Sequence, residues 1–466
     1  MRQMLPALFT AMPFLMAIAM GLALPLFAMQ CHRHFAFGAT LVSLSFLVDT
    51  YFLQSAGIEL GLKLYFADFA LMLIGIIGSV RWLTASDQPR RHWAWLLFAM
   101  VFCAGLAIGL AKAGTAAGVQ ARNDFYSLAA ATYAMSFPIT QRHVRQLADV
   151  LVWIAVLLLA LCVYRWIVYY TPIRELLPPD GSYNIDGPIR VIASNNALVI
   201  GQVLLLGIFF SSAGRGAWVA RLMAPLLLGG VVVLQHRSVW LAVVAGVFVS
   251  LLMAGKQHAS RAQQVLLLGV IGLVTSLALV IGDKGSNLTG QLSRSASTAL
   301  AGQGTAHARL DNWRVTLTEW VAEGPRAIAI GRGFGGDNTR YMFTESGERR
   351  KISFGAHNNY VSVLAGMGVV GFGAWLTVLA FVMKGLYRLC ARGDGGVEAA
   401  ALFVLMCTQL VYYIAYGTDY LQFLIFGVAF AYVAQRQRAA QPSQGRPARP
   451  PVVLFADHAL MPRAPR

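Results

Sequence analysis

A histidine followed by two side-chain amides and a phenol stands where a long polar stretch of the chain meets an apolar run. These residues are His357, Asn358, Asn359 and Tyr360. A neutral imidazole with a pKa near its usual value of about 6.5 can accept a proton from a hydroxyl group. The position therefore predicts acid–base chemistry at the mouth of a membrane helix. The simpler alternative is an interfacial belt, since Tyr and Asn are common at helix ends near lipid headgroups.

Arginines and further histidines are predicted on the same side of the membrane as His357. They are Arg190, Arg237, Arg309, Arg314 and Arg332, with His236 and His307. A guanidinium is always charged and forms paired hydrogen bonds to phosphate oxygens, each contributing about 1.5–3 kcal/mol. Arginines around one histidine predict a site that binds a diphosphate, stabilises it as a leaving group and activates an attacking hydroxyl. For each arginine, a structural ion pair or a headgroup contact is the alternative.

The elements that must position these groups are membrane helices. The chain of 466 residues is 57% hydrophobic and 12% charged, with a mean hydropathy of +0.61. Apolar runs of about 20 residues are long enough to cross a bilayer of about 30 Å. We predict an all-α polytopic membrane protein with twelve or thirteen spans, near 8–29, 35–53, 65–83, 92–110, 124–140, 147–170, 192–212, 217–235, 239–254, 262–282, 359–384, 398–416 and 418–434.

Charge in the connecting loops predicts the orientation and the domains. Lys and Arg recur in alternate loops, which the positive-inside tendency places in the cytoplasm, so His357 faces outward. We expect a helix bundle over 1–282, an external loop over 283–358, C-terminal transmembrane helices over 359–435 and a disordered cytoplasmic tail over 436–466. In the external loop, residues 308–322 have apolar residues at helical spacing and predict an amphipathic helix that ends at Gly324 and Pro325.

Several function classes are disfavoured by composition. The net charge of +17 would suggest nucleic acid as a partner of a soluble domain, but here much of it reflects membrane topology. The five cysteines have no metal-ligand spacing, and no Asp-x-Asp pair occurs. We therefore predict a metal-free mechanism without a cofactor. No internal repeat relates the two halves, which weighs against an inverted-repeat transporter. Asp68 lies at the edge of a predicted span, as a proton relay or as a structural partner.

Three segments resemble the O-antigen ligase and polymerase superfamily. The sequence from His357 to Tyr360, with Gly368 and Gly371 downstream, resembles its His-Asn-x-Tyr signature and the glycines that follow. The turn from Arg237 to Ala242 is similar to its Ser-Arg-Gly-x-Trp-Leu-Ala turn, with His236 in place of Ser and Ser238 in place of Gly. Residues 309–313 resemble its Arg-x-x-x-Trp helix.

The resemblance implies a GT-C-like membrane glycosyltransferase that uses a glycan on undecaprenyl diphosphate. His357 would then be the base that activates the acceptor, and Arg237 and Arg309 would bind the diphosphate. We add Arg190 to the diphosphate site, and we expect support from Asn358, Tyr360, Arg314 and His236. The expected donor and acceptor are the lipid-linked glycan and lipid A-core, on the periplasmic side of a Gram-negative inner membrane. A polymerase or a protein O-oligosaccharyltransferase is the near alternative, and a transporter of lipid-linked sugars is the distant one.

Overall fold

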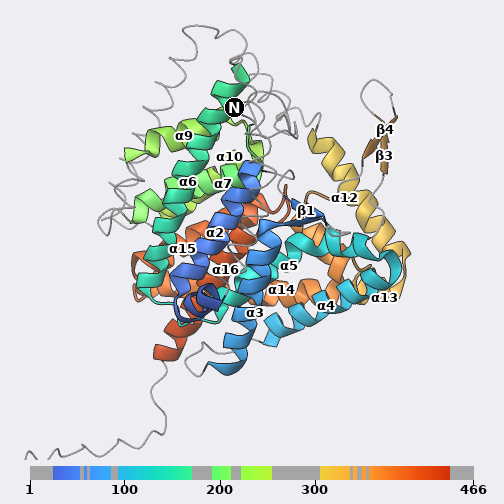
Figure 1. The fold of residues 1–466 in the computed structure, drawn as a ribbon, viewed down its shortest axis with the longest axis horizontal. Coiled ribbons are helices and arrows are strands. Elements are labelled where there is room, and N and C mark those ends of the chain that lie inside the picture. The colour runs from blue at the N-terminus through green and yellow to red at the C-terminus, as the bar shows by residue number, and fades with distance from the viewer. Residues whose placement is uncertain are drawn as a thin grey trace, which may run out of the picture.

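The protein is a bundle of helices with two short hairpins (Figure 1). The computed structural model describes residues 25–52, 57–59, 63–85, 93–170, 191–210, 222–253, 305–335, 340–343, 349–352 and 356–440. Its helices are α2 Phe35–Phe52, α3 Phe66–Thr84, α4 Trp93–Ala113, α5 Thr115–Met135, α6 Gln141–Tyr170, α7 Ser194–Phe209, α9 Ala224–Val233, α10 Arg237–Met253, α12 Thr305–Ala322, α13 Pro325–Ile330, α14 Asn359–Arg392, α15 Gly396–Tyr412 and α16 Tyr420–Ala440. The antiparallel hairpins pair β1 Gly57–Glu59 with β2 Lys63–Tyr65, and β3 Arg340–Phe343 with β4 Arg349–Ile352.

Four of the described helices are long and apolar enough to cross a membrane. They are α3, α4, α6 over Gln141–Val168, and α14. Among the shorter apolar helices of 10–17 residues, α7 packs against α6, and α15 packs against α14. Helix α10 packs against α7 and α15. The predicted all-α polytopic class is therefore confirmed. The number of spans stays a prediction, since the predicted span 262–282 and most of 8–29 lie outside the described residues.

Helix α5 differs most from the predicted boundaries. The apolar run predicts a span at 124–140, whereas the helix covers Thr115–Met135. Its first turns are polar and follow Gly114, whose φ is +58°. Pro138 cannot continue a helix, and a new helix begins only at Gln141. Side chains of the polar half bond to distant segments: Arg122 donates to the carbonyl of Lys63 at 2.8 Å, and Asn123 donates to the carbonyl of Thr418 at 2.6 Å.

Helix α16 passes through the middle of the bundle. Its residues from Tyr420 to Ala434 are all buried, and it packs against α5, α14 and α15. In its first turn, Gln422 exchanges two side-chain hydrogen bonds of 2.9 Å with Gln202 of α7. A buried amide pair of this kind satisfies both polar groups and fixes the register of the two helices.

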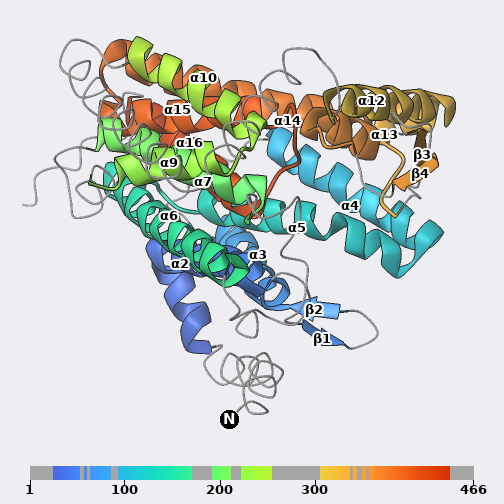
Figure 2. The same ribbon diagram turned by 90° about the horizontal axis from the view of Figure 1, so that it is seen from above.

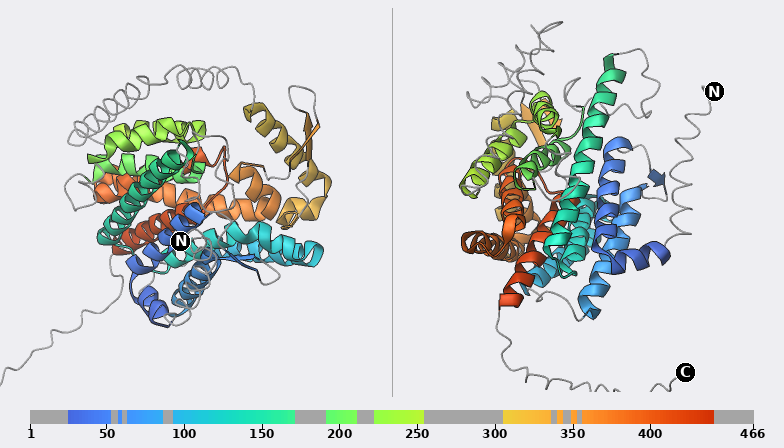
Figure 3. Two further views of the ribbon diagram at one scale, coloured as in Figure 1. Left: turned by 45° about the horizontal axis from the view of Figure 1, so that its top comes forward. Right: turned by 90° about the vertical axis from the view of Figure 1, so that its left-hand side faces the viewer.

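The two predicted sides of the membrane fall at opposite ends of the same helices. At one end Glu398, in the first turn of α15, accepts a 2.7 Å hydrogen bond from Arg145. At the other end of α15, Tyr412 begins the turn that leads to α16. Helix α6, with 30 residues, extends past its neighbours at one end (Figure 3). Helices α12 and α13 lie beside the first part of α14 (Figure 2). They are therefore at the end of the bundle that carries Tyr412, and Trp313 of α12 bonds to Ala356 there.

Candidate active site

His357 lies directly before the capped start of α14. Asn358 is the N-cap residue, and its side-chain oxygen accepts a 3.1 Å hydrogen bond from the backbone N–H of Val361. This bond satisfies a helix N–H that has no partner within the helix. His357 has a φ of +48°, which is uncommon for a non-glycine residue and typical of functional sites. The cap and the unusual backbone together hold the imidazole at the mouth of the helix.

The next two residues attach this helix start to the turn between α15 and α16. The backbone N–H of Asn359 donates to the carbonyls of Tyr413 at 2.9 Å and Tyr416 at 3.1 Å. The hydroxyl of Tyr360 donates to the carbonyl of Leu410 at 2.9 Å. These bonds join residues fifty or more positions apart, and the second explains why a phenol follows the two amides. Their role is to position the helix start.

Helix α12 approaches His357 from the other side and brings Arg309. The indole N–H of Trp313 donates to the carbonyl of Ala356, next to the histidine, at 2.6 Å. One turn earlier, the guanidinium carbon of Arg309 lies 4.7 Å from the ring centroid of Tyr416. The imidazole of His357 meets the same ring at a centroid distance of 6.0 Å and an interplanar angle of 73°. His357 and Arg309 therefore come together at Tyr416.

Charge and burial around His357 favour its neutral form. Burial lowers the pKa of His357, and the positive charge of Arg309 lowers it further. Both effects disfavour the imidazolium, since one removes water and the other adds a like charge. At neutral pH the imidazole is thus available to accept a proton, while the nearby guanidinium provides the charge that an anion needs.

The turn that carries His236 and Arg237 is tied to the same cluster. Gln235 has a φ of +53°, and the buried His236 lies before α10, with its Nε2 3.0 Å from the carbonyl oxygen of Ile192. Two residues after Ile192, the hydroxyl of Ser194 lies 2.7 Å from that of Tyr412. His236 is therefore a structural residue of the turn, and the half-buried Arg237 begins α10 directly after it.

Tyr412 continues this connection to Tyr416. The two rings stack at a centroid distance of 5.1 Å and an angle of 12°. Contacts thus run from the Arg237 turn, through Ser194 and Tyr412, to the ring that meets both Arg309 and His357.

A comparison with protein families matches a part of the chain that contains the predicted base and two of the predicted diphosphate-binding arginines. Residues 200–376 match the family model described as O-antigen ligase. The predicted family resemblance is confirmed for this segment. O-antigen ligase family members are glycosyltransferase-like enzymes that act on lipid-linked glycans. The segment includes Arg237, Arg309 and His357, whereas Tyr412 and Tyr416 lie beyond it. No curated protein matches the chain.

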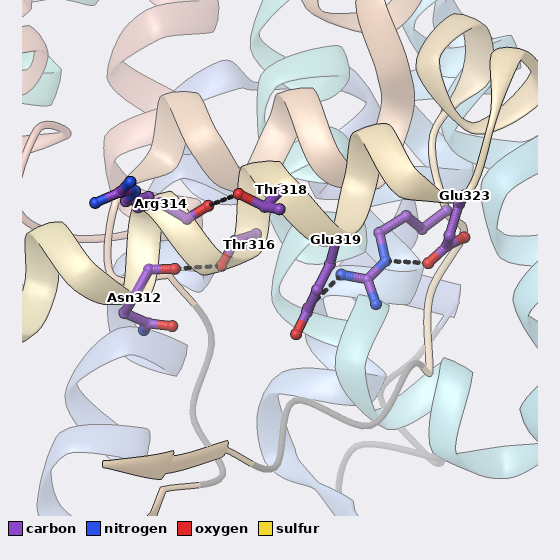
Figure 4. A network of polar contacts seen from close by, with 7 residues as sticks. Asn312, Arg314, Thr316, Thr318, Glu319 and Glu323 are labelled. Atoms are coloured by element: carbon purple, nitrogen blue, oxygen red, sulfur yellow. Dashed lines mark hydrogen bonds and ion pairs between the residues drawn. The ribbon is translucent and has the colours of Figure 1, made fainter. Parts of the chain in front are cut away.

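The other predicted basic residues differ in their surroundings. Arg314 is exposed on α12, and its carbonyl accepts a hydrogen bond from Thr318 (Figure 4). Arg332 donates to Glu319 at 3.2 Å and to Glu323 at 2.7 Å, which is the structural ion pair given above as the alternative for this residue. His307 lies in the first turn of α12. The candidate Arg190 lies outside the described residues.

The glycines of the O-antigen ligase match have a packing role. Gly368 interrupts α14 with a φ of 66° and a ψ of −174°. A Cβ there would lie 2.4 Å from the carbonyl atoms of Ala329. Across the same contact, a Cβ at Gly331 would lie 2.0 Å from the carbonyl oxygen of Gly366. The glycine-rich turn after α13 thus packs backbone against backbone on a kink in α14, and the N–H of Arg332 donates to the carbonyl of Ala365 at 3.0 Å. This turn is a docking element of the fold.

Asp419 is a candidate that the sequence reasoning missed. It is 4% exposed in the turn before α16, and its Oδ1 accepts a 2.9 Å hydrogen bond from the N–H of Gln422. Its Oδ2 has no hydrogen-bond partner within the part of the chain that the structure describes. Burial raises the pKa of Asp419 to about 7. A buried ionisable group in the turn that carries Tyr416 is a functional candidate.

Asp68 has structural partners, as expected from one of the two roles that the sequence left open for it. It accepts hydrogen bonds from the backbone N–H of Tyr65 at 2.6 Å and from the hydroxyl of Tyr126. The guanidinium of Arg122 lies 3.4 Å from the same carboxylate. These contacts cap α3 and join it to α5.

Proposed function

We propose that this protein is an O-antigen ligase. It transfers a glycan from undecaprenyl diphosphate to a sugar hydroxyl of lipid A-core, on the periplasmic side of the inner membrane. The observation that carries the proposal is the meeting of His357 and Arg309 at Tyr416, since it pairs a neutral base with a cation. The O-antigen ligase match over 200–376 supports the reaction class.

The reaction is a direct displacement. The imidazole of His357 accepts the proton of the acceptor hydroxyl as its oxygen attacks the anomeric carbon of the donor sugar. The bond from that carbon to the phosphate oxygen breaks, and undecaprenyl diphosphate leaves with the electron pair. A single displacement inverts the anomeric configuration. Neither the proton transfer nor the displacement requires a metal, so metal independence stays part of the proposal.

The arginines hold the diphosphate and stabilise the charge that develops on it. Arg309 is the first of them, since its guanidinium lies over the ring of Tyr416 and its charge acts on His357. Two further arginines complete the proposed diphosphate site: Arg237, which begins α10, and Arg190, which directly precedes Val191 in the sequence. Asn358 and Tyr360 support the site by fixing the start of α14, and His236 by fixing the Arg237 turn.

The predicted domains fit this assignment. The helix bundle over 1–282 and the helices over 359–435 form the membrane body, and the loop over 283–358 brings Arg309 and His357 to its outer end. The tail over 436–466 has no part in the reaction. With this orientation the attacking hydroxyl and the diphosphate meet at the outer rim of the bilayer.

The test is transfer by the purified protein in detergent. Undecaprenyl-diphosphate glycan is supplied with lipid A-core, with free lipid-linked glycan or with a protein acceptor, each with and without a chelator. We expect transfer to lipid A-core that the chelator does not reduce. Extension of the glycan chain alone would identify a polymerase instead, and glycosylated protein would identify an O-oligosaccharyltransferase. Movement of the donor across liposomes without a product would identify a transporter.

A matched pair of arginine variants tests the diphosphate site. Arg309→Ala removes a cation beside His357, so we expect weaker donor binding and slower transfer. Arg332→Ala removes a cation of the same loop that is paired with Glu319 and Glu323, so donor use should stay near the wild-type level. Equal effects of the two substitutions would contradict the assignment of Arg309.

A further inference from the structure

Three protein groups contact the ring of Tyr416. Tyr412 stacks on it at 5.1 Å with an angle of 12°, and the guanidinium carbon of Arg309 lies over it, 4.7 Å from its centroid. The imidazole of His357 meets it in a T-shaped contact at 73°. The ring is therefore in contact with both groups to which the proposed function assigns a role.

The ring is also held in place from behind. Tyr412 is 1% exposed, and its hydroxyl lies 2.7 Å from that of Ser194 on α7. The carbonyl of Tyr416 accepts the N–H of Asn359, the first residue of α14. Three helices therefore fix the position of one aromatic ring, and that ring lies between the proposed base and the proposed diphosphate ligand.

A cation held over an aromatic face keeps its hydrogen-bond donors available. The donors of a guanidinium lie in its plane, whereas the attraction to the ring acts through its face. Over the described residues, Arg309 makes no ion pair with a carboxylate, in contrast to Arg332, whose donors are bonded to Glu319 and Glu323. The difference is functional: Arg309 is positioned and still able to bind phosphate oxygens, while Arg332 is neutralised.

We propose that Tyr416 is a positioning residue, which presents the guanidinium of Arg309 to the diphosphate at a fixed place beside His357. The inference rests on the proposed function and adds to it a residue outside the O-antigen ligase match. Tyr416 acts through its ring face. Its hydroxyl takes no part, so a phenyl ring performs the same role.

The experiment replaces Tyr416 by phenylalanine and by phenylalanines with one, two and three ring fluorines. Fluorination withdraws electrons from the ring face and weakens its attraction for a cation, while the shape of the side chain changes little. The Kd of undecaprenyl diphosphate is measured by fluorescence titration in detergent micelles. We expect Tyr416→Phe to bind within about threefold of wild type, and the Kd to rise stepwise to about tenfold or more across the fluorine series. A Kd that does not change with fluorination would overturn the proposal.

The same series in an Arg309→Gln background shows whether Tyr416 acts through Arg309. Without the cation, fluorination should leave the Kd unchanged, whereas an equal rise in both backgrounds would overturn the inference. A second readout is the pH dependence of transfer. Tyr416→Leu releases Arg309 from the ring, so the acidic limb of kcat/KM should move to higher pH, and Tyr416→Phe should restore it.

The controls separate this inference from the proposed function. Tyr387→Leu removes an exposed tyrosine near the other end of α14 and should change neither readout. If the wild type binds undecaprenyl diphosphate but transfers glycan to no acceptor, the proposed function fails while the fluorine series still tests Tyr416. If transfer occurs and the fluorine series is flat, the role of Tyr416 fails and the proposed function stands.

Discussion

The kink at Gly368 makes a quantitative prediction for the substitution Gly368→Ala. The φ and ψ of 66° and −174° lie in a region that only glycine populates readily, and a non-glycine residue there costs about 1–3 kcal/mol. The added Cβ would also lie 2.4 Å from Ala329 and 2.5 Å from the backbone nitrogen of Gly331. Backbone atoms cannot rotate away as a side chain can, so overpacking adds about 1–3 kcal/mol. We expect a loss of about 2–6 kcal/mol in the free energy of unfolding.

Denaturant-induced unfolding of the purified protein in detergent micelles measures this loss. Gly373→Ala is the matched control on the same helix, because a Cβ there meets no atom within 4 Å. The control should be neutral, or more stable by up to about 1 kcal/mol, since Ala is the better helix former. The kink also docks the turn that follows α12 and α13, so Gly368→Ala should lower glycan transfer as well. Equal unfolding midpoints for the two variants would refute the kinked structure of α14.

Three further predictions concern titratable groups of the site. The value of kcat/KM should fall as pH decreases through the pKa of His357. Burial, and then the charge of Arg309, hold this pKa below 6.5. A pH–rate profile with an acidic limb at or above 6.5 would contradict the prediction. His357→Gly and His357→Ala should lose transfer equally. The Gly variant should be the more stable of the two by about 1 kcal/mol in denaturant unfolding, because residue 357 has a positive φ. A more stable Ala variant would argue against this backbone conformation. Burial raises the pKa of Asp419 from 3.8 to about 7, so its contribution to stability is present below pH 3.8 and is lost as pH rises through about 7. Asp419→Asn should remove this loss, and unfolding measured across pH would detect it as a gain over wild type at pH 8. No gain at pH 8 would show that burial does not raise the pKa of Asp419.

The sequence predicted the elements whose signals are local and strong. The apolar runs of α3, α4, α6 and α14 give their helices directly, because a span needs only length and hydropathy. The amphipathic helix at 308–322 was also visible, since Trp320 is buried at its predicted face. Leu310, which lies at the same helical spacing, is instead 56% exposed.

The elements that depend on distant partners were not predictable. The polar half of α5 has little apolar pattern, and one of its partners is distant: Asn123 donates to the carbonyl of Thr418, 295 residues away in the chain. The kink at Gly368 needs the approach of Ala329 and Gly331, which no local pattern reveals.

The candidate site shows the same division. The types of residue at His357 and Arg309 suggested a base and a phosphate ligand, because their chemistry is intrinsic to the side chains. Tyr416 and Asp419 were overlooked, since a tyrosine and an aspartate in a short turn carry no signal of what they contact. Their importance comes from burial and from the rings and helix ends around them.

The most direct measurement combines donor binding with a single turnover of the His357→Ala variant. The variant, undecaprenyl-diphosphate glycan and lipid A-core are mixed, and the glycan joined to the acceptor is followed over time. If His357 is the base and Arg309 holds the diphosphate, the variant binds the donor with the wild-type Kd, and transfer falls by about 10²–10⁴. Transfer at the wild-type rate would show that another group takes the proton, and the proposed mechanism would be wrong.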